Sequence, residues 1–174
     1  MSHDFPSLSV SSPDACALMV REQTGTYRSA QFDEVLRAAQ QMLVSRVRGS
    51  NALATPQDVR DFLAVRLGGL EHEVFAVLHL DASNRVIDYV EMFRGTLTQT
   101  AVYPREVLKD AMHRNSASLV LVHNHPSGLG SPSRADELLT KTIKATLGLV
   151  DVRVIDHMIV AGPSVVSMAE LGLL

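Results

Sequence analysis

The sequence contains very little cysteine and no long apolar run. Cys16 is the single cysteine among 174 residues, which rules out an internal disulfide, so a reducing cytoplasm is the expected location. No apolar stretch approaches the ~20 residues of a membrane-spanning helix. Residues 1–20 also lack the basic start and apolar block of a secretory signal. We therefore expect a cytoplasmic protein with no membrane partner.

The sequence also lacks an excess of basic charge. Its net charge is −3, and the first 70 residues balance seven acidic side chains against seven arginines that are spread out. Dedicated nucleic-acid-binding proteins usually carry a basic stripe, and none is visible here. The sequence therefore gives no support to nucleic-acid binding. A local basic patch that forms only in the folded chain remains an alternative.

The size and apolar content fit one domain with a core and an extension. Hydrophobic residues make up 46% of the chain and charged residues 20%, which is ordinary for a globular protein. We expect an N-terminal arm and helix over residues 1–51, followed by the main domain over residues 52–174. Within the first part, residues 1–25 suggest a poorly ordered arm with a short helical turn around residues 15–20. Apolar spacing predicts a helix over residues 32–47, and Gly49, Ser50 and Asn51 form a linker.

Helices and strands alternate in the main domain. Thr55 and Pro56 have the residue types of a helix N-cap and first turn, and Gly68 is expected to end that helix. The remaining pattern predicts strands at 74–80, 85–93, 119–122, 152–160 and 165–168, and helices at 104–115 and 134–147. This alternation predicts an α/β fold in which helices pack on a mixed sheet.

Two histidines and an aspartate form the most informative motif of the chain. His123 and His125 are two positions apart after an apolar run, so their side chains point to the same side of an extended chain, while Asn124 faces away. Asp136 follows in the first turn of the next predicted helix, and the loop rich in proline and glycine can fold it back. Imidazoles and a carboxylate suit zinc and several other first-row metals. Three such ligands leave a fourth position for water, as in a metal-dependent hydrolase.

Hydrolysis also requires a base and a group that stabilises the oxyanion. Ser133 precedes Asp136 by three residues, so it can cap the helix, donate a hydrogen bond to an oxyanion, or do both. Glu73, at the start of the first strand of the main domain, is our choice for the base, with Glu71 and Glu91 as rivals that the local sequence does not separate.

A further histidine lies among apolar residues. His157 is in the middle of a predicted buried strand, and we expect a hydrogen-bonded core histidine there. A supporting role beside the metal is the less favoured alternative.

The motif resembles the signature of a known family. His123-x-His125-Pro126, six residues, Ser133-x-x-Asp136 resembles the JAMM signature of the MPN (JAB) metalloproteases. The longer string from His123 through Asp136 is similar to the bacterial RadC group, and the resemblance covers about residues 52–174. It implies a three-layer fold similar to that of cytidine deaminases, with His123, His125 and Asp136 as zinc ligands.

The resemblance also implies a function. In such a site Glu73 would activate water and Ser133 would stabilise the oxyanion of a peptide or isopeptide substrate. Longer RadC proteins carry an N-terminal helix-hairpin-helix module, whose glycine-rich pattern residues 1–51 lack. Two alternatives remain: a non-catalytic DNA-associated module of the repair or mobile-element type, and a non-haem iron oxygenase, which also uses two histidines and a carboxylate. Substrate identity and oligomeric state are left open.

Overall fold

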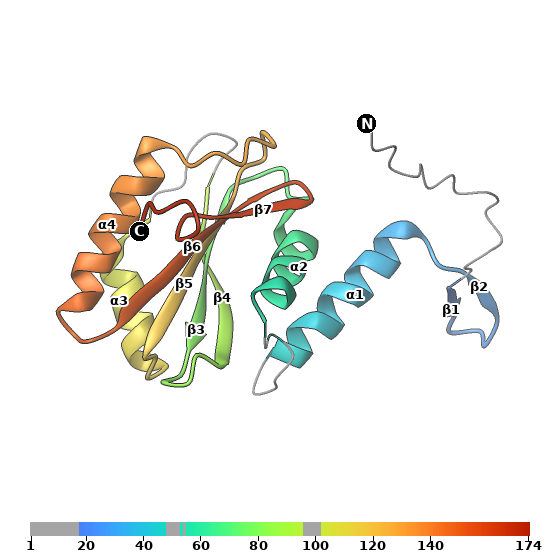
Figure 1. Ribbon diagram of the computed structural model, residues 1–174. Helices are drawn as coiled ribbons and strands as arrows, with labels where there is room; N and C mark the ends of the chain where they lie inside the picture. The colour runs from blue at the N-terminus through green and yellow to red at the C-terminus, as the bar shows by residue number, and fades with distance from the viewer. Residues whose placement is uncertain (1–17, 48–52, 54, 96–101) are drawn as a thin grey trace, which may run out of the picture. The chain divides into compact units, whose positions relative to one another are not determined.

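The computed structural model describes residues 18–47, 53, 55–95 and 102–174, which are drawn in colour in Figure 1. The chain forms two compact units, Met1–Ala39 and Gln40–Leu174. The domain boundary predicted at residue 51 falls in a segment outside the described residues and stays a prediction. The same holds for the predicted linker at residues 49–51 and for the arm over residues 1–17.

The first unit contains a small β-hairpin where we expected an irregular arm and a helical turn. Strands β1 (Met19–Arg21) and β2 (Tyr27–Ser29) pair antiparallel. The turn between them places Gly25 at φ 86°, a left-handed conformation that glycine adopts without steric cost. The expectation of a helical turn reaching residue 20 was therefore wrong, because the glycine turn reverses the chain and gives residues 19–21 a strand partner. Helix α1 (Phe32–Val47) begins and ends where its spacing predicted.

The second unit contains a mixed five-stranded sheet. Its strands are β3 (Val74–Leu80), β4 (Val86–Arg94), β5 (Ser118–Asn124), β6 (Arg153–Ala161) and β7 (Ser164–Ser167), in the spatial order β4-β3-β5-β6-β7. Only the β5–β6 pair within this sheet is parallel, and helix α4 (Arg134–Gly148) connects those two strands. The predicted hairpin of β3 and β4 and the α/β class are confirmed, with strand ends shifted by one or two residues.

Helices cover both faces of this sheet (Figure 1). Helix α2 (Pro56–Leu67) packs Phe62, Leu63 and Leu67 into an apolar cluster on one face. Helices α3 (Pro104–His113) and α4 pack on the other face, where Val107, Ile143 and other buried apolar residues form a second cluster. Because β3 and β5 are buried along their whole length, both clusters share these central strands. The three-layer arrangement is therefore as expected.

Two local features fix helix α2 at its ends. Thr55 accepts a hydrogen bond from the backbone of Asp58, whose carboxylate accepts one from the Thr55 backbone, and Pro56 occupies the first turn. The predicted N-cap is confirmed, and it satisfies backbone donors that a helix start leaves unpaired. At the other end, a Cβ atom on Gly68 would collide with the carbonyl oxygen of Gly162, so this close contact requires glycine. Within the described residues no helix is both long and apolar enough to cross a bilayer.

Candidate metal centre

The two motif histidines lie where the central strand β5 ends. His123 belongs to the strand, pairs with Phe75 of β3, and is 8% exposed. His125 follows the strand, and its backbone N–H donates to the carbonyl of Val160 at 2.8 Å, which continues the parallel pairing with β6. The strand is longer than the predicted 119–122, and it fixes the His123 backbone within the sheet. Both histidines therefore stand at the carboxyl end of a parallel strand pair, a common position for α/β ligand sites.

Asp136 reaches the same point from the start of helix α4. Ser133 caps this helix: its hydroxyl accepts from the Asp136 N–H at 3.2 Å and donates to Asp136 Oδ2 at 2.7 Å. Partial burial opposes ionisation of Asp136, but hydrogen bonding to His123, the charge of His123 and the Ser133 hydrogen bonds outweigh it, so the Asp136 pKa lies below its usual range. Asp136 is therefore an anion at neutral pH.

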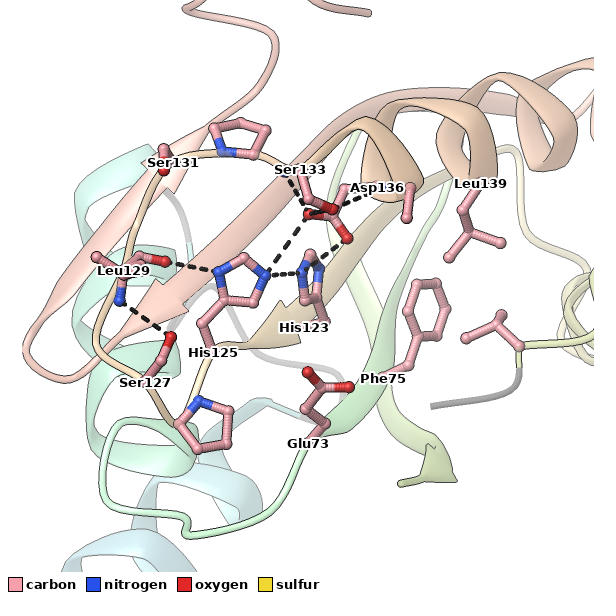
Figure 2. A pocket seen from close by; sticks show the side chains of 14 residues that line it. Glu73, Phe75, His123, His125, Ser127, Leu129, Ser131, Ser133, Asp136 and Leu139 are labelled. Atoms are coloured by element: carbon pink, nitrogen blue, oxygen red, sulfur yellow. Dashed lines mark hydrogen bonds and ion pairs between the residues drawn. The ribbon is translucent and has the colours of Figure 1, made fainter. Parts of the chain in front are cut away.

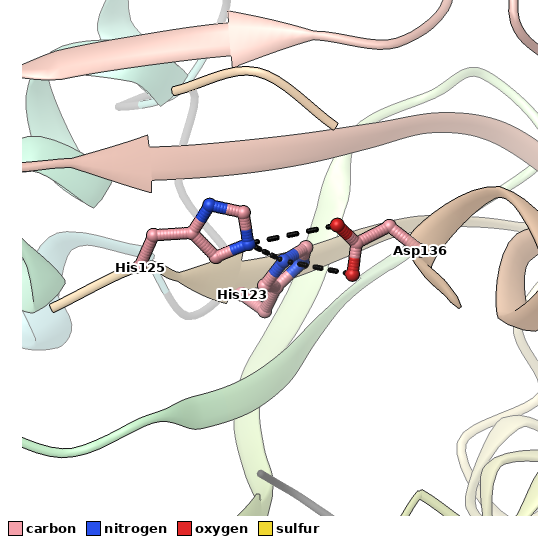
Figure 3. A group of neighbouring side chains, drawn as sticks. All are labelled: His123, His125 and Asp136. Atoms are coloured by element: carbon pink, nitrogen blue, oxygen red, sulfur yellow. Dashed lines mark hydrogen bonds and ion pairs between the residues drawn. The ribbon is translucent and has the colours of Figure 1, made fainter. Parts of the chain in front are cut away.

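The three side chains converge on one point (Figure 3). Nε2 of His123 lies 2.8 Å from Nε2 of His125 and 3.2 Å from Oδ1 of Asp136. The second carboxylate oxygen, Oδ2, lies 3.6 Å from Nε2 of His125. One ligand atom from each residue lies within 4.8 Å of the others. The structure thus brings together the three residues that the sequence predicted as ligands.

The hydrogen bonds on the far side of each ring let us assign the tautomers. Nδ1 of His125 lies 2.6 Å from the carbonyl oxygen of Leu129, which can only accept, so Nδ1 carries the proton. The Thr140 hydroxyl donates to the Asp136 carbonyl at 2.6 Å and must therefore accept from Nδ1 of His157, also at 2.6 Å. Nε2 of His157 is then an acceptor for Nδ1–H of His123, at 2.8 Å.

The ring of His157 stays neutral in this chain of hydrogen bonds. It is fully buried, and burial, helped by the charge of His123, lowers its pKa to about 3. The prediction of a hydrogen-bonded core histidine is confirmed, and its partner is the motif histidine His123 itself. The neighbouring Asp156 plays a different part, because its carboxylate accepts hydrogen bonds from the backbone of His157 and from Ser167.

When both rings are neutral, these assignments leave two lone pairs facing each other. Nε2 of His123 and Nε2 of His125 lie 2.8 Å apart and stand beside an ionised carboxylate. Such a cluster of electron-rich atoms repels itself unless a proton or a cation lies among them. Two neutral imidazoles and one carboxylate are also a donor set that suits zinc. The residues therefore fit a divalent cation.

A cavity of about 640 Å³ opens over this cluster (Figure 2). Glu73, just before β3, lines it, and in Figure 2 its side chain points toward the two histidines. Its two rivals lie elsewhere: Glu71 is exposed and outside the lining, and Glu91 forms an ion pair with Arg66 at 2.7 Å. Phe75 and Leu139 form an apolar wall beside the cluster, and the loop that carries Leu129 lies on the other side.

Sequence reasoning missed three supporting residues. Thr140 and the Leu129 carbonyl orient the histidine rings through contacts that only the folded chain creates. Asn124 does face away from the two histidines, as strand alternation predicts, but its contacts were not foreseen. Its amide bonds to the backbone on both sides of Glu73. A signal was present, because a polar residue directly after the apolar strand 119–122 must satisfy its hydrogen bonds when buried.

The fold and the cluster together define an α/β protein with a candidate metal centre at the end of a central strand. Comparison with known proteins identifies the family. A family model described as "RadC-like JAB domain" matches residues 53–173, so the chain belongs to the RadC-like group of the JAB/MPN family.

Similar proteins occur in several bacteria. The chain is 52% identical over 161 residues to a UPF0758 protein of Leptothrix cholodnii and 55% identical over 150 residues to one of Polaromonas sp.. It is 54% identical over 149 residues to a UPF0758 protein of Acidovorax sp.. These alignments cover 92%, 86% and 86% of this chain and 72%, 67% and 63% of the three relatives. The chain thus spans about two thirds of the length of these relatives.

Proposed function

We propose that this chain is a zinc-dependent hydrolase of the JAMM type that cleaves peptide or isopeptide bonds. Membership of the JAB family supports a hydrolase at the family level. The observation that carries the proposal is the convergence of two imidazole nitrogens and one carboxylate at the mouth of a cavity. A cation among these groups offsets the negative charge of the carboxylate and binds the imidazole nitrogens.

His123, His125 and Asp136 would hold the metal. When bound by three protein ligands, zinc supplies a Lewis acid that lowers the pKa of a coordinated water to about 7. Contacts within the chain orient these ligands in two ways. The bonds from His123 to His157 and from His125 to Leu129 fix the ring tautomers, and the Ser133 cap holds the Asp136 carboxylate.

Glu73 is the proposed general base. Its side chain lines the cavity and points toward the histidine pair, whereas Glu71 is outside the lining (Figure 2). The Glu73 carboxylate accepts a proton from the attacking water as the oxygen adds to the carbonyl carbon. It then gives that proton to the leaving nitrogen, so the C–N bond breaks into a carboxylic acid and an amine. Glu73 therefore ends the cycle in its starting state.

Ser133 is the proposed donor to the oxyanion. Its hydroxyl proton is directed to Asp136 Oδ2 in this structure, at 2.7 Å. Rotation about one side-chain bond redirects that proton into the cavity, which Ser133 also lines. One donor to the oxyanion is worth roughly a 100-fold effect on rate.

A DNA-associated role receives no comparable support from this site. Among the described residues that line the cavity there is no lysine or arginine, whereas Glu73 and Asp136 add negative charge. Phosphate groups would be repelled from such a surface. Binding of duplex DNA near physiological salt, with a steep salt dependence, would favour the DNA-associated role instead.

Metal analysis tests the proposal first. The purified chain, loaded with zinc and dialysed, is expected to retain one zinc per chain, and His123→Ala to retain none. His113→Ala, at an exposed histidine on α3, is the matched control and should retain zinc like the parent. Iron bound in place of zinc would favour the oxygenase alternative, and no bound metal at all would refute the proposal.

Hydrolysis is tested with a matched pair of glutamates. The zinc-loaded chain is incubated with degenerate peptides and with a peptide linked through a lysine side chain, and new amines are quantified. We expect Glu73→Gln to lower kcat roughly 100-fold or more while zinc stays bound. Glu71→Gln, at an exposed position two residues away, should match the parent. Equal rates in the two variants would exclude Glu73 as the base.

A further inference from the structure

We propose that Asn124 is a positioning residue that holds Glu73 in register with the histidine pair. This inference rests on the proposed function only for the chemical role of Glu73. The contact itself stands on the geometry of the strands. Asn124 is the residue between the two proposed ligands, so one short segment would set the places of both the metal ligands and the base.

The Asn124 amide bonds to the backbone on both sides of Glu73. Its Oδ1 accepts from the Val74 N–H at 2.8 Å, and its Nδ2 donates to the His72 carbonyl at 3.0 Å. A backbone N–H only donates and a carbonyl only accepts, so these partners also fix the orientation of the amide. The side chain therefore clamps the two peptide groups that flank Glu73.

A third bond closes the segment from the other side. The Gly95 N–H, just after β4, donates to the Glu73 carbonyl at 2.8 Å. Glu73 precedes β3, and the regular β3–β5 pairing begins only at Phe75 and His123. Without Asn124, the backbone of residues 72–74 would lack these bonds to β5. The two Asn124 bonds thus attach the residues just before Phe75 to β5, beyond the Phe75–His123 pair at which the regular pairing begins.

Strand geometry explains why an amide occupies this position. Successive side chains of a strand alternate between faces, so Asn124 must point away from His123 and His125. It is 2% exposed, and a buried amide is costly unless its donor and acceptor are both bonded. An apolar side chain would fill the space but would leave the His72 carbonyl and the Val74 N–H without these partners. Because Asn124 lies between the two histidines in sequence, its amide holds the backbone on both sides of Glu73 close to the proposed ligands.

Amide exchange tests the clamp without any need for activity. The Val74 N–H of the full chain is followed by NMR in the parent, in Asn124→Leu and in Asn124→Asp, with zinc present. We expect exchange at Val74 to accelerate at least about tenfold in Asn124→Leu, because both bonds are lost. In Asn124→Asp the acceptor for Val74 remains and only the donor to His72 is lost, so a smaller acceleration is expected. Ser116→Ala, which removes a buried hydrogen bond to His79 at 2.9 Å, is the control and should not affect Val74.

A double-variant experiment distinguishes positioning from a general structural role. Asn124→Leu is expected to lower kcat roughly 100-fold with KM and zinc stoichiometry unchanged, since a small displacement of a catalytic group has effects of that size. If Asn124 acts through Glu73, then Glu73→Gln combined with Asn124→Leu is no slower than Glu73→Gln alone. Asn124→Asp serves the same comparison if the leucine variant does not fold.

Either experiment can overturn the inference. Val74 exchange within about twofold of the parent in both variants refutes the clamp. A further loss of rate in the double variant, or loss of zinc from the single variants, shows that Asn124 supports the fold or the ligands and not the base. If the parent chain hydrolyses no peptide, the proposed function fails, and the exchange data alone then decide whether Asn124 holds the segment.

Discussion

Nδ1 of His123 donates a hydrogen bond to Nε2 of His157 across a distance of 2.8 Å. The second ring of this pair is buried and neutral, and it is held in turn by Thr140. Because Thr140 also donates to the carbonyl of Asp136, one chain of hydrogen bonds joins two of the proposed ligands. Partners of this kind fix the orientation of a metal-binding histidine.

The first prediction concerns His157. Replacing it with phenylalanine keeps a ring of similar shape but removes the acceptor for His123, so the tautomer and orientation of His123 are no longer fixed. We expect zinc affinity to fall roughly 10- to 100-fold, measured by competition with a chromogenic chelator. His79→Gln, at another fully buried histidine, is the control for lost stability and should leave zinc affinity unchanged. A His157→Phe variant with parental affinity would show that His123 needs no such partner.

The second prediction concerns Thr140. Thr140→Val removes the hydroxyl at nearly constant volume, and we expect zinc affinity to drop by up to about tenfold because His157 loses its orienting acceptor. Thr140→Ser retains the hydroxyl and should restore most of the affinity. Thr142 makes the same type of bond to the carbonyl four residues earlier but is exposed, so Thr142→Val is the matched control. Equal zinc affinities in the two valine variants would contradict the role of Thr140 in orienting His157.

The third prediction concerns removal of the metal. Both faces of the sheet have apolar cores, so the chain should stay folded without zinc. Binding adds stability by mass action, about 3 kcal/mol at a zinc concentration 100 times the Kd. For a chain of this size we expect a Tm rise of roughly 6–10 °C in calorimetry, reversed by a chelator. His123→Ala should show no rise and His113→Ala the full rise. A rise of equal size in His123→Ala would place the bound metal elsewhere.

The fourth prediction concerns pH and His79. Burial lowers the pKa of His79 to about 4, against the attraction of Asp110, whereas an unfolded histidine titrates near 6.5. Between these values the unfolded chain binds more protons than the folded one, so the free energy of unfolding decreases as the pH falls. The slope from this group is about 1 kcal/mol per pH unit.

Urea denaturation at several pH values checks the effect of His79. The parent and His79→Gln should differ most in stability near neutral pH, and the difference should shrink as the pH falls from 6.5 toward 4. A difference that is constant over this range would mean that His79 does not titrate differently in the two states. Because the carboxylates away from His79 titrate alike in both proteins, the comparison isolates the contribution of His79 together with its neighbour Asp110.

The sequence predicted most of the elements because their signals are local. Thr55 and Ser133 cap helices through hydrogen bonds within four residues, and the apolar runs of β3 and β5 need only burial to become strands. The hairpin of β1 and β2 escaped prediction. Its strands have three residues each, too few for an alternating pattern to be recognised, and its turn depends on Gly25.

The sequence by itself determined the proposed ligand set. A spacing of two along an extended chain puts His123 and His125 on one side, and a helix start puts Asp136 within reach of the same loop. The tertiary structure alone decided which groups surround these ligands. His157 comes from β6 and Glu73 precedes β3, whereas Thr140 shares helix α4 with Asp136 but meets His157 only in the folded chain. Their hydrogen bonds, and the separation of Glu73 from its rivals Glu71 and Glu91, depend on strand order and register, which no local pattern encodes.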